Sequence, residues 1–300
     1  MSEIPAYTLA YYGCNHEGYD GGGHDSHIGT NWIDIWGTGW EKELADIMAF
    51  PKYNPLADIS SLREYEWPNP NDENIYGYIY KSRDEFTEDD CFITGFHRDT
   101  LWEKAYMLVG MENMLVNLLT EPEFAKEILH KIMDFQLGIA KHYVKCGVEL
   151  VLLGDDLGTQ KSLIIGEELL YEFFVPEYRR LINYYKEQGI IISFHSCGHI
   201  EPLLDMFIEL GINVLNPIQA TANNLAYVRE KTDNKMALLG GVSTKLVMDG
   251  SIEEIEIAVK DAIYLLGKNG GYFCAPDQSM PFPKEKITAF HKAVDYYGKM

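Results

Sequence analysis

From about residue 91 onward, short apolar runs rich in β-branched residues alternate with longer stretches of helical periodicity. This alternation is typical of a parallel sheet whose strands are connected by helices. The later runs are apolar nearly throughout, as expected for strands that are covered on both faces. We expect strands at 91–95, 149–154, 190–194, 213–217, 236–240 and 271–275, and helices at 121–145, 166–187, 201–210, 222–231, 251–267 and 284–297.

Six such units in roughly 200 residues favour an α/β fold of the (β/α)8 TIM-barrel type over an open, doubly wound sheet. No Gly-x-Gly-x-x-Gly motif follows the first expected strand, so the dinucleotide-binding form of the open sheet loses its main support. The first 90 residues are rich in Gly, Tyr, Trp, Asn and Pro. We expect one more strand there, at 8–12, followed by long N-terminal loops over the C-terminal face of the strands. Residues 1–300 are treated as a single domain.

The charge of the chain limits its partners. Its 25 Lys and Arg residues stand against 46 Asp and Glu residues, a net charge of -21, which repels phosphate backbones and anionic lipids. Nucleic acid and membrane are therefore not expected as partners. The N-terminus has no basic stretch leading into an apolar one, and no run of about 18 apolar residues occurs, so a cytoplasmic location is expected. A homodimer is a candidate assembly.

Five widely spread cysteines favour thiols or metal ligands over a disulfide framework. His195 and Cys197 lie two residues apart where the strand at 190–194 ends, and side chains two apart on an extended chain face the same way. Cys274, at the end of the last expected strand, is a third soft ligand, because barrels place active-site residues at such strand ends. Two thiolates and an imidazole match a catalytic Zn²⁺ that keeps one position open. The alternatives are two buried thiols with a core histidine, or His199 as a rival ligand.

Asp155 and Asp156 follow the strand at 149–154, in a turn flanked by glycines. One carboxylate can face the pocket while the other accepts hydrogen bonds from backbone N–H groups. A pocket carboxylate can act as general acid or base, or orient a metal ligand, whereas the alternative role for both is helix capping. Gln160, in the run 154–160, and Asn216, in the expected strand at 213–217, are candidate substrate-binding residues.

Three tryptophans surround an aspartate in the segment 31–40. Aromatic walls suit an apolar or aromatic ligand, so Trp32 and Trp36 are candidate substrate-binding residues. Core packing is the alternative role for both tryptophans.

The run 154–160, the His195-Ser196-Cys197-Gly198 turn and the late segment 270–276 together resemble the uroporphyrinogen-decarboxylase-like superfamily. More narrowly, they resemble its zinc-dependent, corrinoid-linked methyltransferase branch, over about residue 32 to the C-terminus. The resemblance implies a barrel, zinc on His195, Cys197 and Cys274, and methyl transfer to or from the cobalt of a separate corrinoid-binding protein. It also places Asp34 where the decarboxylases keep their essential aspartate, which makes Asp34 a candidate catalytic residue.

The chain departs from the decarboxylases at their arginine-rich N-terminal motif, because its first arginine is Arg63. A porphyrinogen with many carboxylates needs cationic partners, so decarboxylation is not favoured. The segment Asp25-Ser26-His27-Ile28-Gly29 is one residue short of the corrinoid-binding motif, and the corrinoid is therefore expected on another chain.

Zinc would serve methyl transfer by deprotonating a thiol acceptor, or by binding the heteroatom of a methylated donor. The expected substrate is a small methylated molecule: a methoxyaromatic, which the tryptophans favour slightly, a methylamine, or a thiol or thioether. Asp155 or Asp156 would donate or relay a proton to the departing heteroatom. The alternatives are a metal-free decarboxylase and a non-catalytic barrel that binds a small molecule.

Overall fold

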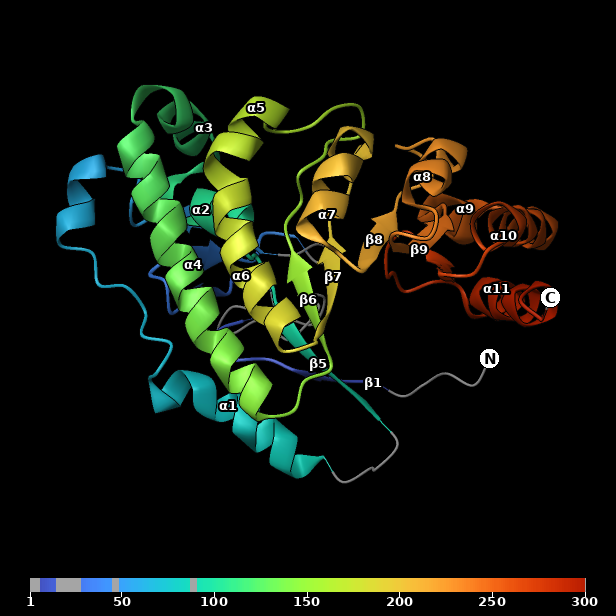
Figure 1. Cartoon of the computed structure of the whole chain (residues 1–300), viewed down its shortest axis with the longest axis horizontal. Helices are drawn as coiled ribbons and strands as arrows, with labels where there is room; N and C mark the ends of the chain where they lie inside the picture. Colours follow the sequence, from blue (N-terminus) through green and yellow to red (C-terminus); the bar gives the residue numbers. More distant parts are fainter. Residues whose placement is uncertain (1–5, 15–27, 45–48, 87–90, 300) are drawn as a thin grey trace. The chain divides into compact units, whose positions relative to one another are not determined.

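The computed structural model describes residues 6–14, 28–44, 49–86 and 91–299 (Figure 1). Residues 25–27 of the near-motif for corrinoid binding thus lie outside the described residues. The chain forms two compact units, which we call the first unit (Pro5–Asp155 with Glu168–Ile190) and the second unit (Asp156–Glu167 with Ile191–Met300).

The first unit is built on three parallel strands in the order β1-β5-β6. They are β1 (Ala6–Leu9), β5 (Phe92–His97) and β6 (Leu150–Gly154). A separate antiparallel sheet contains β2 (Asn31–Ile33), β3 (Gly39–Glu41) and β4 (Phe50–Tyr53). The helical segments are the 3-10 helix η1 (Ile59–Arg63), α1 (Glu73–Glu85), α2 (Trp102–Val109), α3 (Met111–Thr120), α4 (Pro122–Lys145), the short α5 (Glu167–Leu169), the π-helix η2 (Leu170–Phe174) and α6 (Val175–Glu187).

Helix α4 is held closely against β5. A Cβ atom at Gly95 would come within 2.9 Å of the ring of Tyr143 on α4, so the absence of a side chain at residue 95 permits this approach. His97 at the end of β5 is fully buried, with Nδ1 2.7 Å from Gln136 Oε1 of α4 and Nε2 2.5 Å from Tyr185 Oη of α6. Burial lowers the pKa of His97 to about 4, so its ring is neutral at pH 7 and links the strand to both helices by hydrogen bonds.

The second unit is built on four parallel strands in the order β7-β8-β9-β10. They are β7 (Ile191–His195), β8 (Val214–Ile218), β9 (Ala237–Val242) and β10 (Tyr272–Pro276). The helices are the 3-10 helix η3 (Glu201–Leu203), α7 (Leu204–Leu210), α8 (Leu225–Thr232), α9 (Thr244–Asp249), α10 (Ile252–Leu266) and α11 (Lys284–Tyr297). Val242 of β9, Val259 of α10 and Phe290 of α11 belong to one buried apolar cluster.

These units confirm the predicted α/β class of TIM type: within the described ranges, seven parallel strands alternate with helices along the chain. The six strands expected after residue 91 are all present, each within about one or two residues of its predicted bounds. The strand expected at 8–12 is found at 6–9 as β1. Several elements differ from the prediction, among them α1 and α9, which no expected helix covers. The sheet β2–β4 was expected as loop, and helices α2 and α3 were not expected at all.

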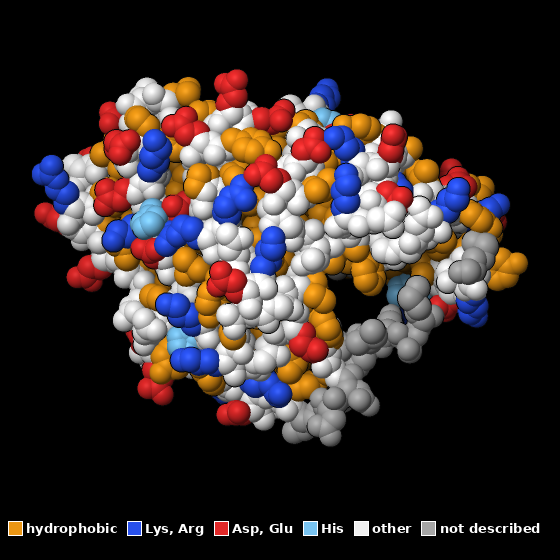
Figure 2. Space-filling model, viewed as in Figure 1, with side chains coloured by type: hydrophobic (Ala, Val, Ile, Leu, Met, Phe, Trp, Pro, Cys, Tyr) orange, Lys and Arg blue, Asp and Glu red, His pale blue; other side chains and the backbone are white. Residues whose placement is uncertain are grey.

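Charged side chains of both signs are mixed on the surface that Figure 2 shows. Figure 2 shows Lys and Arg side chains interspersed with Asp and Glu over the visible face rather than gathered into one basic patch. Among the helices of the described residues, none is both long enough and apolar enough to cross a membrane.

Candidate metal site and adjoining cavity

The site begins at the turn where β7 ends. His195 is the last residue of the strand, and Ser196 N–H donates to the carbonyl of Asn216 on β8 at 2.8 Å. Gly198 then takes a left-handed conformation with φ +85°, and a Cβ atom at this residue would overlap the backbone of Gly158. Glycine is therefore required here both for its backbone conformation and for the close approach of the two segments. The turn leaves His195 and Cys197 at the end of β7.

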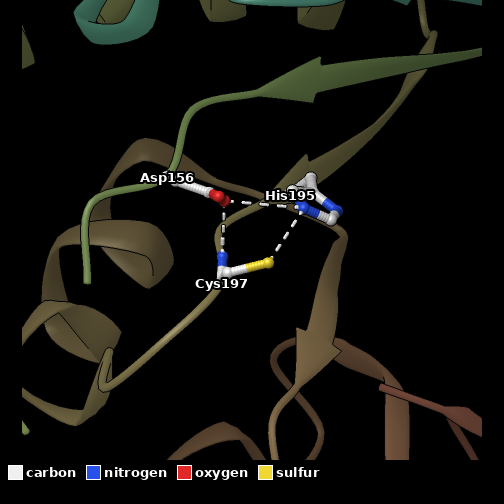
Figure 3. A group of neighbouring side chains, drawn as sticks. All are labelled: Asp156, His195 and Cys197. Carbon is white, nitrogen blue, oxygen red and sulfur yellow. Dashed lines mark hydrogen bonds and ion pairs between the residues drawn. The ribbon is translucent and has the colours of Figure 1, made fainter. Parts of the chain in front are cut away.

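Three potential metal ligands meet at this turn. His195 Nε2 lies 3.4 Å from Cys197 Sγ and 3.5 Å from Asp156 Oδ1, and one ligand atom from each residue falls within a group no wider than 4.8 Å (Figure 3). Asp156 Oδ1 also accepts the backbone N–H of Cys197 at 2.8 Å. All three side chains are half-buried. Nitrogen, sulfur and oxygen donors in one small space, with access from outside, suit a transition-metal ion such as Zn²⁺.

A side-chain amide adjoins the sulfur of this group. Gln278 Nε2 donates to Cys197 Sγ at 2.7 Å. The backbone N–H of Gln278 donates in turn to Thr244 Oγ1 at 2.7 Å, which fixes the start of the segment after β10. A hydrogen bond donated to the sulfur favours the thiolate over the thiol. The sequence reasoning missed Gln278, although its position just beyond the last strand could have marked it.

The structure does not bring Cys274 to this group. Ala275 of β10 lines a cavity together with His195, whereas Cys274, one residue earlier on the strand, packs with Tyr272 toward α10 and α11. Side chains alternate along a strand, so the two neighbours face opposite sides. Burial raises the pKa of the Cys274 thiol to about 11, which keeps it protonated at neutral pH. Asp156, and not Cys274, is the third member of the group.

The cavity beside the metal group has a volume of about 620 Å³. It is lined by polar and apolar side chains that include His195, Asn216, Leu239, Asp277, Gln278 and Phe282. The candidate substrate-binding residue Asn216 therefore shares one cavity with a residue of the metal group. Gln160, the other candidate of this unit, accepts a hydrogen bond from Gln219 Nε2 at 3.1 Å, and Gln219 Oε1 accepts the N–H of Gly198 at 2.9 Å.

The lining of this cavity includes an acid, Asp277, which the sequence analysis also did not predict. It follows β10 directly, and only 5% of its surface is exposed. Its Oδ2 accepts the backbone N–H of Ala220 at 3.3 Å, and the N–H of Gly241 donates to the same carboxyl group. Burial raises the pKa of Asp277 to about 7, an effect that the two backbone donors reduce.

Asp155 belongs to the first unit and has the capping role that was its alternative. Its carboxylate accepts hydrogen bonds from the backbone N–H groups of Leu101 and Glu103 and from the hydroxyl of Tyr178, each at 2.7 Å. Because the two N–H groups belong to the start of α2, Asp155 caps this helix from the end of β6. The side chain is fully buried, and burial raises its pKa to about 7 against the lowering effect of these donors.

Asp34 organises a turn of the first unit. Its Oδ1 accepts the backbone N–H groups of Trp36 and Thr38 at 2.8 and 3.0 Å, and its Oδ2 accepts the indole N–H of Trp40 at 2.9 Å. Trp36 is 1% exposed and packs edge-on against Phe135, so it is a core residue. Trp32 stacks on Trp40 across β2 and β3. These contacts agree with the core-packing alternative for the tryptophans.

A family model described as uroporphyrinogen decarboxylase (URO-D) matches residues 46–297, well over half of the chain. The chain belongs to the URO-D family. Among curated proteins, this URO-D family member is 26% identical over 187 residues to a methylated-thiol–coenzyme M methyltransferase of Methanosarcina mazei, with 62% of this chain and 48% of the relative covered. It is 22% identical over 148 residues to the methylcobamide:CoM methyltransferase MtbA of the same organism, with 49% and 42% covered.

This URO-D family member therefore spans about half the length of the curated relatives it matches. Among solved structures, it is similar to a methyltransferase from Methanosarcina mazei, with a TM-score of 0.66, 16% identity, and 88% of this chain and 77% of the other covered. That similarity supports the fold. The predicted resemblance to the superfamily and to its methyltransferase branch is confirmed.

Proposed function

We propose that this protein transfers a methyl group between a small methylated substrate and the cobalt of a corrinoid held by a separate protein, with the help of a zinc ion. The observation that carries the proposal is the group of Asp156, His195 and Cys197 beside a cavity, in a chain similar to proteins named methyltransferases. The named relatives act on a methylated thiol or a methylcobamide. We extend this class of reaction to the present chain.

The donor set fits zinc. Imidazole nitrogen, thiolate sulfur and carboxylate oxygen are all common zinc ligands, and a set of three leaves a fourth position for substrate. Asp156, His195 and Cys197 would hold the ion in this proposal, because Cys274 faces α10 and α11. Bound zinc would supply a Lewis acid that lowers the pKa of a thiol or polarises a methylated heteroatom.

The residues of the chain prepare this site in three ways. Asp156 accepts the N–H of Cys197 and so fixes the turn that carries the sulfur. Gln278 donates to that sulfur and offsets the charge of the thiolate. Leu239 and Phe282 give the cavity an apolar wall for a methyl group, while Asn216 offers an amide to a polar substrate atom.

The substrate proposed first is a small thiol or its methyl thioether. The relative named for a methylated thiol supports this choice. A methoxyaromatic substrate is less favoured, because Trp36 is a core residue of the first unit. A decarboxylase of acidic tetrapyrroles is disfavoured, because the lining of this cavity includes Asp277 and, among the described residues, neither Arg nor Lys. A methylamine donor, the cytoplasmic location and the homodimer stay predictions.

The direct test is methyl transfer from methylcobalamin, alone and bound to a corrinoid-binding protein, to 2-mercaptoethanol. We expect the wild type to form the methyl thioether and the Cys197→Ser variant to lose at least about 100-fold in rate, a loss typical of removing a group that acts on the reacting atoms. Cys146→Ser changes a buried thiol of the first unit and serves as the matched control, with an expected rate near that of the wild type. No transfer by the wild type with either methyl donor would contradict the proposal.

A further inference from the structure

Two carboxamide side chains from the loop after β8 hold the turn that carries Cys197. Gln219 Oε1 accepts the backbone N–H of Gly198 at 2.9 Å. Asn223 Nδ2 donates to the carbonyl of Gly198 at 2.9 Å, and Asn223 Oδ1 accepts the N–H of Ile200 at 2.9 Å. Gln219 is half-buried, and Asn223 is buried. Both backbone polar groups of Gly198 are therefore hydrogen-bonded to side chains of this one loop.

These contacts fix the backbone on both sides of the Cys197 Cα atom. The N–H of Cys197 donates to Asp156 Oδ1 at 2.8 Å, which orients the peptide group before this atom. The bond from the Gly198 N–H to Gln219 orients the peptide group after it. Because a peptide group is planar, holding both groups restricts the two backbone dihedral angles of Cys197 and sets the direction of its Cα–Cβ bond. In this orientation the sulfur lies 3.4 Å from His195 Nε2.

The glycine in the turn makes this restraint necessary. Gly198 has φ +85°, and glycine populates positive and negative φ about equally, so the residue alone does not keep the turn in one conformation. A binding site needs its ligand atoms held to within about 0.5 Å by the packing and hydrogen bonds around them. Hydrogen bonds to the backbone of Gly198 supply that constraint where the residue itself does not.

The loop after β8 is itself fixed at two further points. Gln219 Nε2 donates to Gln160 Oε1 of the loop after β6 at 3.1 Å. The backbone N–H of Ala220 donates to Asp277 Oδ2 at 3.3 Å, and the residue after Asp277 is Gln278, which donates to the sulfur of the metal group. The loops after β6, β7, β8 and β10 thus form one hydrogen-bonded network around this sulfur, and Gln219 links three of them.

We propose that Gln219 is a positioning residue that holds the sulfur of Cys197 in place to bind a metal ion. The inference rests on the proposed function, in which Cys197 is a zinc ligand. Gln219 is not a member of the metal group and acts on it through the backbone of the turn. Loss of a hydrogen bond that orients a metal ligand typically weakens metal affinity about 10–100-fold. A merely structural role would lower stability and leave the affinity of the folded protein unchanged.

The first experiment measures metal affinity apart from methyl transfer. The protein competes with a chromophoric chelator for Zn²⁺ and for Co²⁺. Gln219→Met keeps the length of the side chain and removes the acceptor of the Gly198 N–H, so we expect an affinity at least about tenfold weaker than that of the wild type. The control Asn224→Ala removes the N-cap of α8, and it should lower the temperature of unfolding without changing the affinity. Equal affinities for Gln219→Met and the wild type would overturn the proposal.

The absorption spectrum of the Co²⁺-loaded protein tests whether the effect passes through the sulfur. A thiolate bound to Co²⁺ absorbs in the near ultraviolet, and the strength of this band depends on how the sulfur and the metal overlap. We expect the band to weaken or shift in Gln219→Met. It should return in Gln219→Glu, because the new carboxylate restores an oxygen acceptor for the Gly198 N–H. A band in Gln219→Met identical to that of the wild type would overturn the positioning role.

The same measurements, combined with the methyl-transfer assay, separate this inference from the proposed function. Weaker metal binding and an altered band in Gln219→Met, with no methyl transfer by the wild type, would support the positioning role and contradict the proposed function. Methyl transfer by the wild type, with equal metal affinities for the two proteins, would overturn the positioning role and leave the proposed function intact. A wild type that binds neither Zn²⁺ nor Co²⁺ would overturn both.

Discussion

Asp155 and Asp156 are neighbours in sequence with opposite roles in the structure, so their replacement separates stability from metal binding. Asp155→Ala removes the acceptor of three hydrogen bonds of 2.7 Å, which come from two N-terminal N–H groups of α2 and from the Tyr178 hydroxyl. Leaving a buried donor unsatisfied costs about 1–3 kcal/mol, and loss of a helix cap costs about 0.5–2 kcal/mol. Because these effects overlap, we expect a loss of about 3–5 kcal/mol in the free energy of unfolding, a large part of the total stability of a typical domain.

Asp156→Ala is the matched control. Its side chain is 41% exposed and accepts one backbone N–H, so we expect a loss of about 1 kcal/mol or less in the metal-free protein. Both variants are compared with the wild type by urea unfolding followed by circular dichroism, in the presence of a chelator. A loss below about 1 kcal/mol for Asp155→Ala, or equal losses for the two variants, would refute the assignment of Asp155 as a buried helix cap.

Three further predictions follow from particular contacts. Gly198→Ala should lower the free energy of unfolding by more than about 2 kcal/mol. The control Gly147→Ala, which is also at positive φ but has no atom within 4 Å of the new Cβ, should lower it by only about 1 kcal/mol. Similar losses for the two variants in urea unfolding would contradict the close approach of Gly198 to Gly158. Gln278→Ala should slow the modification of Cys197 by iodoacetamide about three- to tenfold in the metal-free protein at pH 7. The control Gln188→Ala, at an exposed residue, should leave this rate unchanged. Equal rates for the two variants would exclude the Gln278 amide as a stabiliser of the Cys197 thiolate. Burial raises the pKa of Asp277 above its unfolded value, so its stabilising contribution is complete below about pH 4 and is lost as pH rises through about 7. Between pH 4.5 and 8, the free energy of unfolding of Asp277→Asn should therefore rise by about 1–3 kcal/mol relative to that of the wild type in urea unfolding. A difference between the two proteins that does not depend on pH would refute this prediction.

Local sequence pattern predicted the strands well because each is a short apolar run that ends in small or polar residues. The run 149–154 became β6 at Leu150–Gly154, and the run 271–275 became β10 at Tyr272–Pro276. The sheet β2–β4 escaped prediction because two of its strands contain only three residues, too few to show an alternating pattern. Helix α2 has six buried residues among its eight, so it lacks the polar face that marks an amphipathic helix.

The sequence predicted the residues of the candidate site only where local backbone geometry determines their positions. His195 and Cys197 lie together because alternate residues at a strand end face the same way. The same rule cannot tell which face Cys274 takes, because the register of β10 against β9 sets that face. Asp277 and Gln278 were missed because their positions depend on Val242 and Thr244, more than 30 residues earlier in the chain. Contacts of this range leave no local pattern in the sequence.

The measurement that tests the central claim most directly is the zinc content of the purified protein by elemental analysis, for the wild type and for the variants Asp156→Asn, Cys197→Ser and Cys274→Ser. The proposed metal group predicts about one zinc per chain in the wild type and in Cys274→Ser, and a clear loss in Asp156→Asn and Cys197→Ser. The proposed metal group would be contradicted if the wild type did not bind added zinc. It would also be contradicted if Cys274→Ser lost zinc while Asp156→Asn retained it.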